Sequence, residues 1–226
     1  MEKSEIELQL NKIIEDLEPQ SKYKWIPYLG SDYLSENQTK RVLIVGESTY
    51  LENVEGGYWN SLHNLQEYPT RQVNEVAIHD RGNFFKAVRK IVQVDRNVDG
   101  KSFWDNVAFI NMVRVPMFNS NQRPINAQYE FGSRLLLKML PIIKPDVVII
   151  FSKKSSDFFR GALKASSHIL EEVGNYADRK IGKKHIYHFL INKGTPDQVE
   201  FIGTHHPRSG VKVNELKSYL TLHKIL

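Results

Sequence analysis

The sequence predicts an α/β fold, a single domain with a mainly parallel central sheet of about four strands flanked by helices. Three observations predict it. Short apolar runs, typical of strands buried on both faces, occur at residues 41–46, 107–111, 146–151 and 199–203. Helical patterns follow these or neighbouring segments, at about 82–94, 126–143, 153–166 and 211–225. The chain has 226 residues, which suits one large domain and is short for two.

The remaining segments complete the predicted domain, which covers residues 1–226. Apolar residues near a helical period predict an amphipathic helix over 4–18, and we expect it to pack on the main domain. Residues 22–39 mix aromatic residues with Pro and Gly, which indicates an ordered loop. A further strand is predicted at 185–191. Gly56 and Gly57 lie in a polar, aromatic loop, and we interpret them as a hinge or tight turn that gates a pocket.

Composition excludes several classes of function. The chain has no cysteine, which excludes disulfides, thiolate zinc sites, cysteine-held iron–sulfur clusters and cysteine nucleophiles. Its longest fully apolar stretch, 147–151, is far shorter than the ~20 residues of a membrane span, so we expect a soluble, cytoplasmic protein with no membrane partner. The phosphate-binding G-x-x-x-x-G-K-[ST], dinucleotide-binding G-x-G-x-x-G and hydrolase G-x-S-x-G motifs are absent. The formal net charge of +5 suits a polyanionic partner, and a basic, solvated surface is the alternative.

Polar residues follow the predicted strands. In an open α/β sheet, ligands bind beyond the carboxyl ends of the strands. The four segments at these ends are GESTY at 46–50, NMVR at 111–114, SKK at 152–154 and GTHHPRS at 203–209. They bring a carboxylate (Glu47), a carboxamide (Asn111) and an imidazole (His206) to one edge, and we expect these side chains to lie within about 10 Å of one another.

These motifs resemble the uracil-DNA glycosylase superfamily, in their order across roughly residues 22–226. The family's first motif, G-[QEILM]-[DNA]-P, corresponds to GEST at 46–49; a strand ending in Asn corresponds to FIN at 109–111, with Trp104 before it; and the closing His-Pro-Ser motif corresponds to HPRS at 206–209. A less studied branch, with W-x-G-x-x-Y before the first strand and G-E-S-H-Y after it, is similar to residues 25–33 and 46–50.

The match has departures. Thr49 stands in the place of the family's proline, and Ser48 stands where several families hold a catalytic Asp or Asn. Glu47 takes the place of a glutamate used by the iron–sulfur branch, whose cluster this cysteine-free chain does not carry. No apolar wedge to fill the gap left by a flipped base is evident after Pro207.

The resemblance implies cleavage of the N-glycosidic bond of a deaminated or damaged base in DNA. This reaction develops positive charge on the sugar and negative charge on the departing base. Glu47 would steady the sugar cation or orient water, and His206 would donate to the uracil O2. Asn111 would distinguish uracil from cytosine by the order of donors and acceptors on the base edge. Tyr50 would line the pocket or stack on the base. Contacts to flanking phosphates are assigned to Ser209, Arg208, Lys153, Lys154 and Arg114.

Other interpretations of the same residues remain open. Glu47 could cap a helix, Asn111 could satisfy buried backbone, and Lys153 and Lys154 could be solvated residues of a helix start. His205 and His206 project oppositely in an extended chain, so no metal is expected, and no cofactor is implied. Two other functions stay possible: a non-catalytic protein that binds nucleic acid or a nucleobase, and a small-molecule hydrolase that uses Glu47 and His206 as an acid/base pair.

Overall fold

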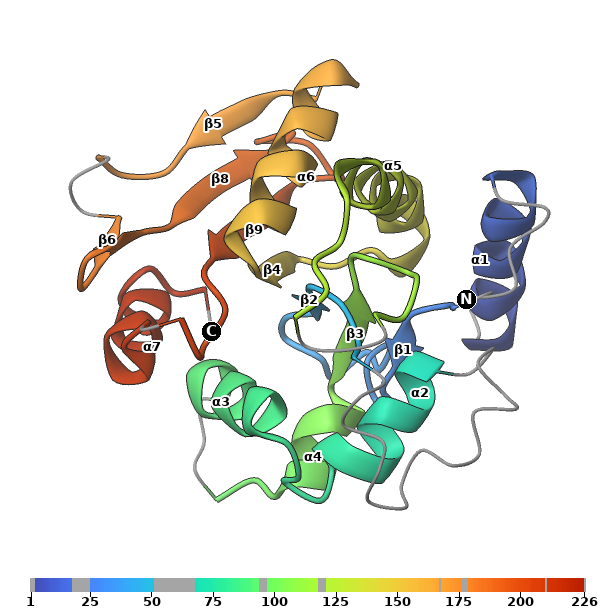
Figure 1. The fold of residues 1–226 in the computed structure, drawn as a ribbon, viewed down its shortest axis with the longest axis horizontal. Coiled ribbons are helices and arrows are strands. Elements are labelled where there is room, and N and C mark those ends of the chain that lie inside the picture. Colours follow the sequence, from blue (N-terminus) through green and yellow to red (C-terminus); the bar gives the residue numbers. More distant parts are fainter. Residues whose placement is uncertain are drawn as a thin grey trace.

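The computed structural model describes residues 3–17, 25–50, 68–93, 97–117, 121–166, 168–175, 179–209 and 211–225. Figure 1 shows its arrangement, a twisted sheet with helices on both faces. The loop that contains Gly56 and Gly57 lies outside the described residues.

Four strands form the parallel centre of the sheet. They are β2 (Val42–Gly46), β3 (Val107–Asn111), β4 (Val147–Phe151) and β9 (Val199–Thr204), in the spatial order β3-β2-β4-β9. All residues of β2, β3 and β4 are buried, as expected for parallel strands covered on both faces. The four strands predicted from the apolar runs are therefore confirmed.

Antiparallel strands extend this centre on both sides, so the sheet is mixed. β1 (Tyr28–Leu29) pairs with β3, β8 (Tyr187–Ile191) pairs with β9, and β5 (Leu170–Glu172) pairs with β8. The sheet thus has seven strands among the described residues, where the sequence predicted about four. β8 was expected as a strand. β1 is too short to give a pattern, and β5 is partly exposed and polar, so neither produces an apolar run.

One face of the sheet is covered by α1 (Lys3–Leu17), α5 (Asn126–Ile143) and α6 (Lys153–Ala165). Successive side chains of a strand point to opposite faces, so alternate strand residues such as Leu43 and Val45 pack against these helices. The three helices were predicted at 4–18, 126–143 and 153–166, and they are confirmed within one residue at each end.

The other face is covered by α2 (Tyr68–Gln72), the π-helical turn η3 (Val73–Ala77), α3 (Asn83–Val92), α4 (Gly100–Asp105) and α7 (Val213–Leu222). The sequence predicted α3 and α7 but not the three shorter elements, which contain too few turns for a periodic pattern. A separate hairpin of β6 and β7 pairs residues 180–181 with 184–185.

None of the described helices combines the length and the apolar character needed to cross a bilayer.

Candidate functional site

The strand order defines one place where a ligand is expected. Numbered along the chain, the four parallel strands stand in the order 2-1-3-4, so β3 and β4 flank β2 on opposite sides. In such sheets the connections reverse direction between the first and third strands, and ligands bind at the carboxyl ends next to that point. Here that point lies between β2 and β4. Glu47 directly follows β2, and Ser152 directly follows β4.

Glu47 is held across this point by two hydroxyl groups. The Tyr129 hydroxyl, from α5, donates to Glu47 Oε1 at 2.9 Å, and the Ser152 hydroxyl, at the start of α6, donates to the same oxygen at 2.8 Å. Among the described residues no group donates to Oε2, which leaves that oxygen for a ligand or water. Because both donors are side chains, the described residues give no support to Glu47 as a helix cap.

The surroundings of Tyr129 keep it a donor. Burial, and then the charge of Glu47, raise the pKa of the Tyr129 phenol well above its ordinary value. Its ring stacks on Phe158 with centroids 5.3 Å apart, and the ammonium nitrogen of Lys154 lies 4.7 Å from the ring centre. The phenol therefore stays protonated at neutral pH, where it can donate to Glu47.

His206 presents a neutral imidazole with a defined tautomer. Burial lowers the pKa of His206, which outweighs the opposite effect of the Glu47 charge. The backbone N–H of Arg208 donates to His206 Nδ1 at 3.1 Å, so in the neutral ring the proton is on Nε2. The turn is fixed further by Ser209, whose backbone N–H and hydroxyl donate to the His206 carbonyl at 2.8 and 2.7 Å. His206 Nε2–H is thus a donor that no described residue uses.

Phe84 lies against His206. Its ring stacks on the imidazole with centroids 5.3 Å apart and planes inclined by 26°. It also contacts Phe151, at the end of β4, edge to face. The sequence analysis did not single out Phe84 as a site residue. The signal available was its place in the first turn of α3, beside the more deeply buried Phe85.

Asn111 lies inside a small polar network. Its side-chain Nδ2 donates to Thr49 Oγ1 at 2.9 Å and to Gln72 Oε1 at 3.1 Å, and all three residues are buried. Its Oδ1 lies over Gly46, where an added Cβ would come within 2.2 Å of it. Both amide hydrogens are therefore occupied by side chains, and the carbonyl oxygen is the remaining polar atom. The sequence analysis predicted neither a role for Gln72 nor the contact between Thr49 and Asn111.

The three predicted residues meet at one edge of the sheet. The charge of Glu47 acts on His206. Phe84 connects His206 to Asn111, because its Cζ lies 3.5 Å from the Cβ position of Gly46, next to Asn111 Oδ1. That their side chains lie within about 10 Å of one another stays a prediction.

Tyr50 contacts a residue that the sequence analysis did not name. Arg123 Nη1 donates to the Tyr50 hydroxyl at 3.1 Å. The charge of Arg123 also disfavours the protonated form of His206. Arg123 lies in a polar segment before Pro124, and nothing in that segment distinguishes it in sequence.

Two of the residues predicted to bind phosphate have other surroundings. Lys153 Nζ is 2.7 Å from Asp157 and donates to the Tyr187 hydroxyl at 2.6 Å, so its charge is already paired. Arg114 is only 3% exposed, so its side chain is not presented at the surface.

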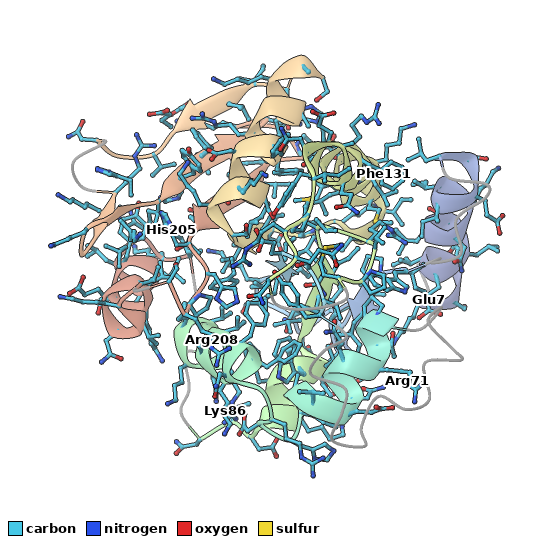
Figure 2. The ribbon with its side chains drawn as sticks, in the orientation of Figure 1. Glu7, Arg71, Lys86, Phe131, His205 and Arg208 are labelled. Carbon is cyan, nitrogen blue, oxygen red and sulfur yellow. The ribbon has the colours of Figure 1, made fainter. Side chains whose placement is uncertain are left out.

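The other three differ in what they offer. Lys154 and Arg208 are exposed, and Arg208 is marked in Figure 2. The Ser209 hydroxyl donates within its own turn, which leaves its oxygen as an acceptor. Their contacts to phosphate stay a prediction.

The two adjacent histidines have different neighbours. His205 interacts electrostatically with Lys184, Lys153 and Asp157, and burial together with these lysines lowers its pKa. His206 interacts with none of those three. Across the described part of the chain, no group of three or more His, Asp or Glu side chains is placed to hold a metal ion.

The chain was also compared with known proteins. No model of a protein family matches it, and no curated protein matches it.

Proposed function

We propose that the protein hydrolyses the N-glycosidic bond of a deaminated or damaged base in DNA. The observation that carries the proposal is the pairing of Glu47, whose Oε2 is open, with the neutral His206, whose Nε2–H is open, at the carboxyl edge of the sheet. The resemblance of the strand-end motifs to the uracil-DNA glycosylase superfamily supports the same reaction.

The proposed reaction uses these two groups on opposite sides of the bond that breaks. Water attacks the anomeric carbon of the sugar, and the bond to the base nitrogen breaks with its electron pair on the base. Glu47 stabilises the sugar cation and takes a proton from the water as its oxygen bonds to the sugar, and this proton is then transferred to the departing base. His206 donates from Nε2 to a base carbonyl as negative charge gathers there. The products are an abasic sugar and a free base.

DNA as the partner is supported by exposed cations near this edge. Lys154 and Arg208 are exposed, and so is Arg123 beyond its contact with Tyr50. Such groups contact phosphates without sequence preference. The excess of positive charge over the whole chain, +5, favours the same partner.

The test is base release from oligonucleotides that carry uracil, hypoxanthine or xanthine, measured as strand cleavage at the abasic site under alkali. We expect Glu47→Gln to reduce release by at least ~10²-fold while oligonucleotide affinity stays nearly unchanged. Glu7→Gln is the matched control, because Glu7 is partly exposed on α1, which packs on α5 away from the carboxyl edge (Figure 2), and it should leave release unchanged. Equal, small effects of the two substitutions would remove the proposed role of Glu47.

A non-catalytic binding protein is the second candidate. It is favoured by Thr49, which replaces the family's proline and uses its side chain to hold Asn111. No release of any deaminated base by the wild type, together with tight and retained oligonucleotide binding, would support this candidate over the first.

A further inference from the structure

We propose that Gln72 and Thr49 determine which base the site accepts. They fix the Asn111 amide so that its carbonyl oxygen faces the ligand, and Gln72 adds N–H donors beside it. The site then recognises a base edge in which a ring N–H lies next to a carbonyl. This inference rests on the proposed function, because it takes the ligand to be a nucleobase.

The first step is the orientation of Asn111. An amide has two hydrogens on nitrogen, and here they point to two oxygens, Thr49 Oγ1 and Gln72 Oε1, at 2.9 and 3.1 Å. With Gln72 Oε1 facing Asn111, turning the amide over would place two carbonyl oxygens against each other and the nitrogen over Gly46. The Thr49 hydroxyl can accept or donate, so Gln72 Oε1 is the group that favours the orientation in which Oδ1 lies over Gly46.

The second step is the orientation of Gln72. Since Gln72 Oε1 accepts from Asn111, its Nε2 points elsewhere with two hydrogens. Among the described residues neither Gln72 Nε2 nor Asn111 Oδ1 has a hydrogen-bond partner, yet neither belongs to the fully enclosed polar atoms that lack one. Both atoms therefore keep some contact with solvent, although their residues are only 5% and 8% exposed. Gln72 ends α2 directly before the π-helical turn η3, a kind of irregularity that is frequent at functional sites.

The third step is the position of this pair relative to His206. Asn111 Oδ1 lies at Gly46, and Phe84, which stacks on His206, reaches the same position. The edge thus offers an acceptor from Asn111 with donors from Gln72 and His206 around it. In uracil, a ring N–H lies between two carbonyls, which complements this order. In cytosine the same ring position is an acceptor and the neighbouring group is an amino donor, so both contacts would be mismatched.

The experiment measures base preference by binding, without relying on catalysis. The probes are two single strands of identical sequence, one with 2′-fluoro-2′-deoxyuridine and one with 2′-fluoro-2′-deoxycytidine at the same position, because the fluorine slows glycosidic cleavage. Fluorescence anisotropy gives Kd for each strand, and the ratio of the two Kd values is the preference. The wild type is expected to prefer the uridine strand by at least about tenfold.

Gln72→Met and Thr49→Val each remove an acceptor for Asn111, and each should reduce the preference about tenfold. Thr49→Ser keeps the hydroxyl and should keep the preference. If Gln72→Met does not fold, Gln72→Glu decides, because it keeps an acceptor for Asn111 and replaces the donors by an oxygen; it should lose the preference as well. Folding of every variant is checked by its unfolding midpoint.

Two results would overturn the inference, and they differ in what else they overturn. If folded Gln72 and Thr49 variants keep the preference of a wild type that also releases uracil, only the role of these two residues is lost. If the wild type shows no preference and releases no base, the proposed function is lost with it.

Discussion

A methyl group added at Gly46 is expected to disrupt the polar network around Asn111. The added Cβ would lie 2.2 Å from Asn111 Oδ1, far inside any permitted contact, whereas its next neighbours, the carbon of the same amide and Phe84 Cζ, are at 3.4 and 3.5 Å. The conflict is therefore with one oxygen. Asn111 is 5% exposed and is held by two hydrogen bonds, so turning away from the added methyl group would weaken or break them.

The cost can be worked out from these contacts. Overpacking in a close-packed interior costs typically about 1–3 kcal/mol. If Asn111 turns away to relieve it, the two hydrogen bonds from Nδ2 are weakened or lost, at about 1 kcal/mol each. We expect Gly46→Ala to lower the free energy of unfolding by roughly 2–4 kcal/mol, a large part of the 5–15 kcal/mol of an ordinary domain.

Urea unfolding with linear extrapolation measures this change. Gly161→Ala is the matched control, because Gly161 lies within α6, is exposed and has no atom within 4 Å of its added Cβ; it should raise stability by about 0.5–1 kcal/mol. In an Asn111→Ala background, Gly46→Ala should cost much less than in the wild type, since the clashing oxygen is gone. A Gly46→Ala variant within about 0.5 kcal/mol of the wild type, or the same cost in both backgrounds, would refute the reasoning.

Three further predictions concern the edge of the sheet. Tyr129→Phe should lower base release about tenfold, seen in kcat rather than KM, because Glu47 loses one of the two donors that orient it; an unchanged kcat would contradict this. Burial lowers the pKa of His206 below its ordinary 6.5. Protonation puts a hydrogen on Nδ1, which in the neutral ring accepts from the Arg208 N–H and holds the turn, so release should decline as pH falls through that lower pKa. As pH falls below 6.5, the unfolded chain binds the proton more readily than the folded chain, so the contribution of His206 to the free energy of unfolding also decreases. In a plot of the free energy of unfolding against pH, His206→Gln should flatten this part of the curve. If the protein binds DNA, the logarithm of the binding constant should fall linearly with the logarithm of the salt concentration, and Arg208→Ala should reduce the slope by about 1; an unchanged slope would place Arg208 away from phosphate.

The elements with strong local patterns could be predicted from the sequence. The four apolar runs correspond to β2, β3, β4 and β9, since a strand buried on both faces needs an unbroken series of apolar residues. The long amphipathic helices were predicted for a similar reason, because each carries one apolar stripe over several turns. The short elements β1, α2 and η3 have too few residues to produce either pattern, and their positions depend on what they pack against.

The strand ends that hold the candidate site also follow from the sequence, through the rule that ligands bind beyond the carboxyl ends of parallel strands. That rule selected Glu47, Asn111 and His206. It could not select the strand order, which depends on contacts between distant segments and which decides that β2 and β4 are neighbours.

The roles of individual side chains were decided by tertiary structure. Tyr129 and Ser152 are 82 and 105 residues from Glu47, and Gln72 is 39 residues from Asn111, so no local pattern connects them. Two residues predicted to bind phosphate show the same limit. Nothing near Arg114 in sequence shows that it is buried. The pair of Lys153 with Asp157 is local, four residues apart on one helix, but the contact of Lys153 with Tyr187 is not. Sequence determines which groups are brought to the edge of the sheet, because strand periodicity is local. Tertiary packing determines which hydrogens and lone pairs of Glu47 and Asn111 remain open, because their partners are distant in the chain. His206 Nδ1, by contrast, is occupied by the backbone N–H of Arg208, two residues further along.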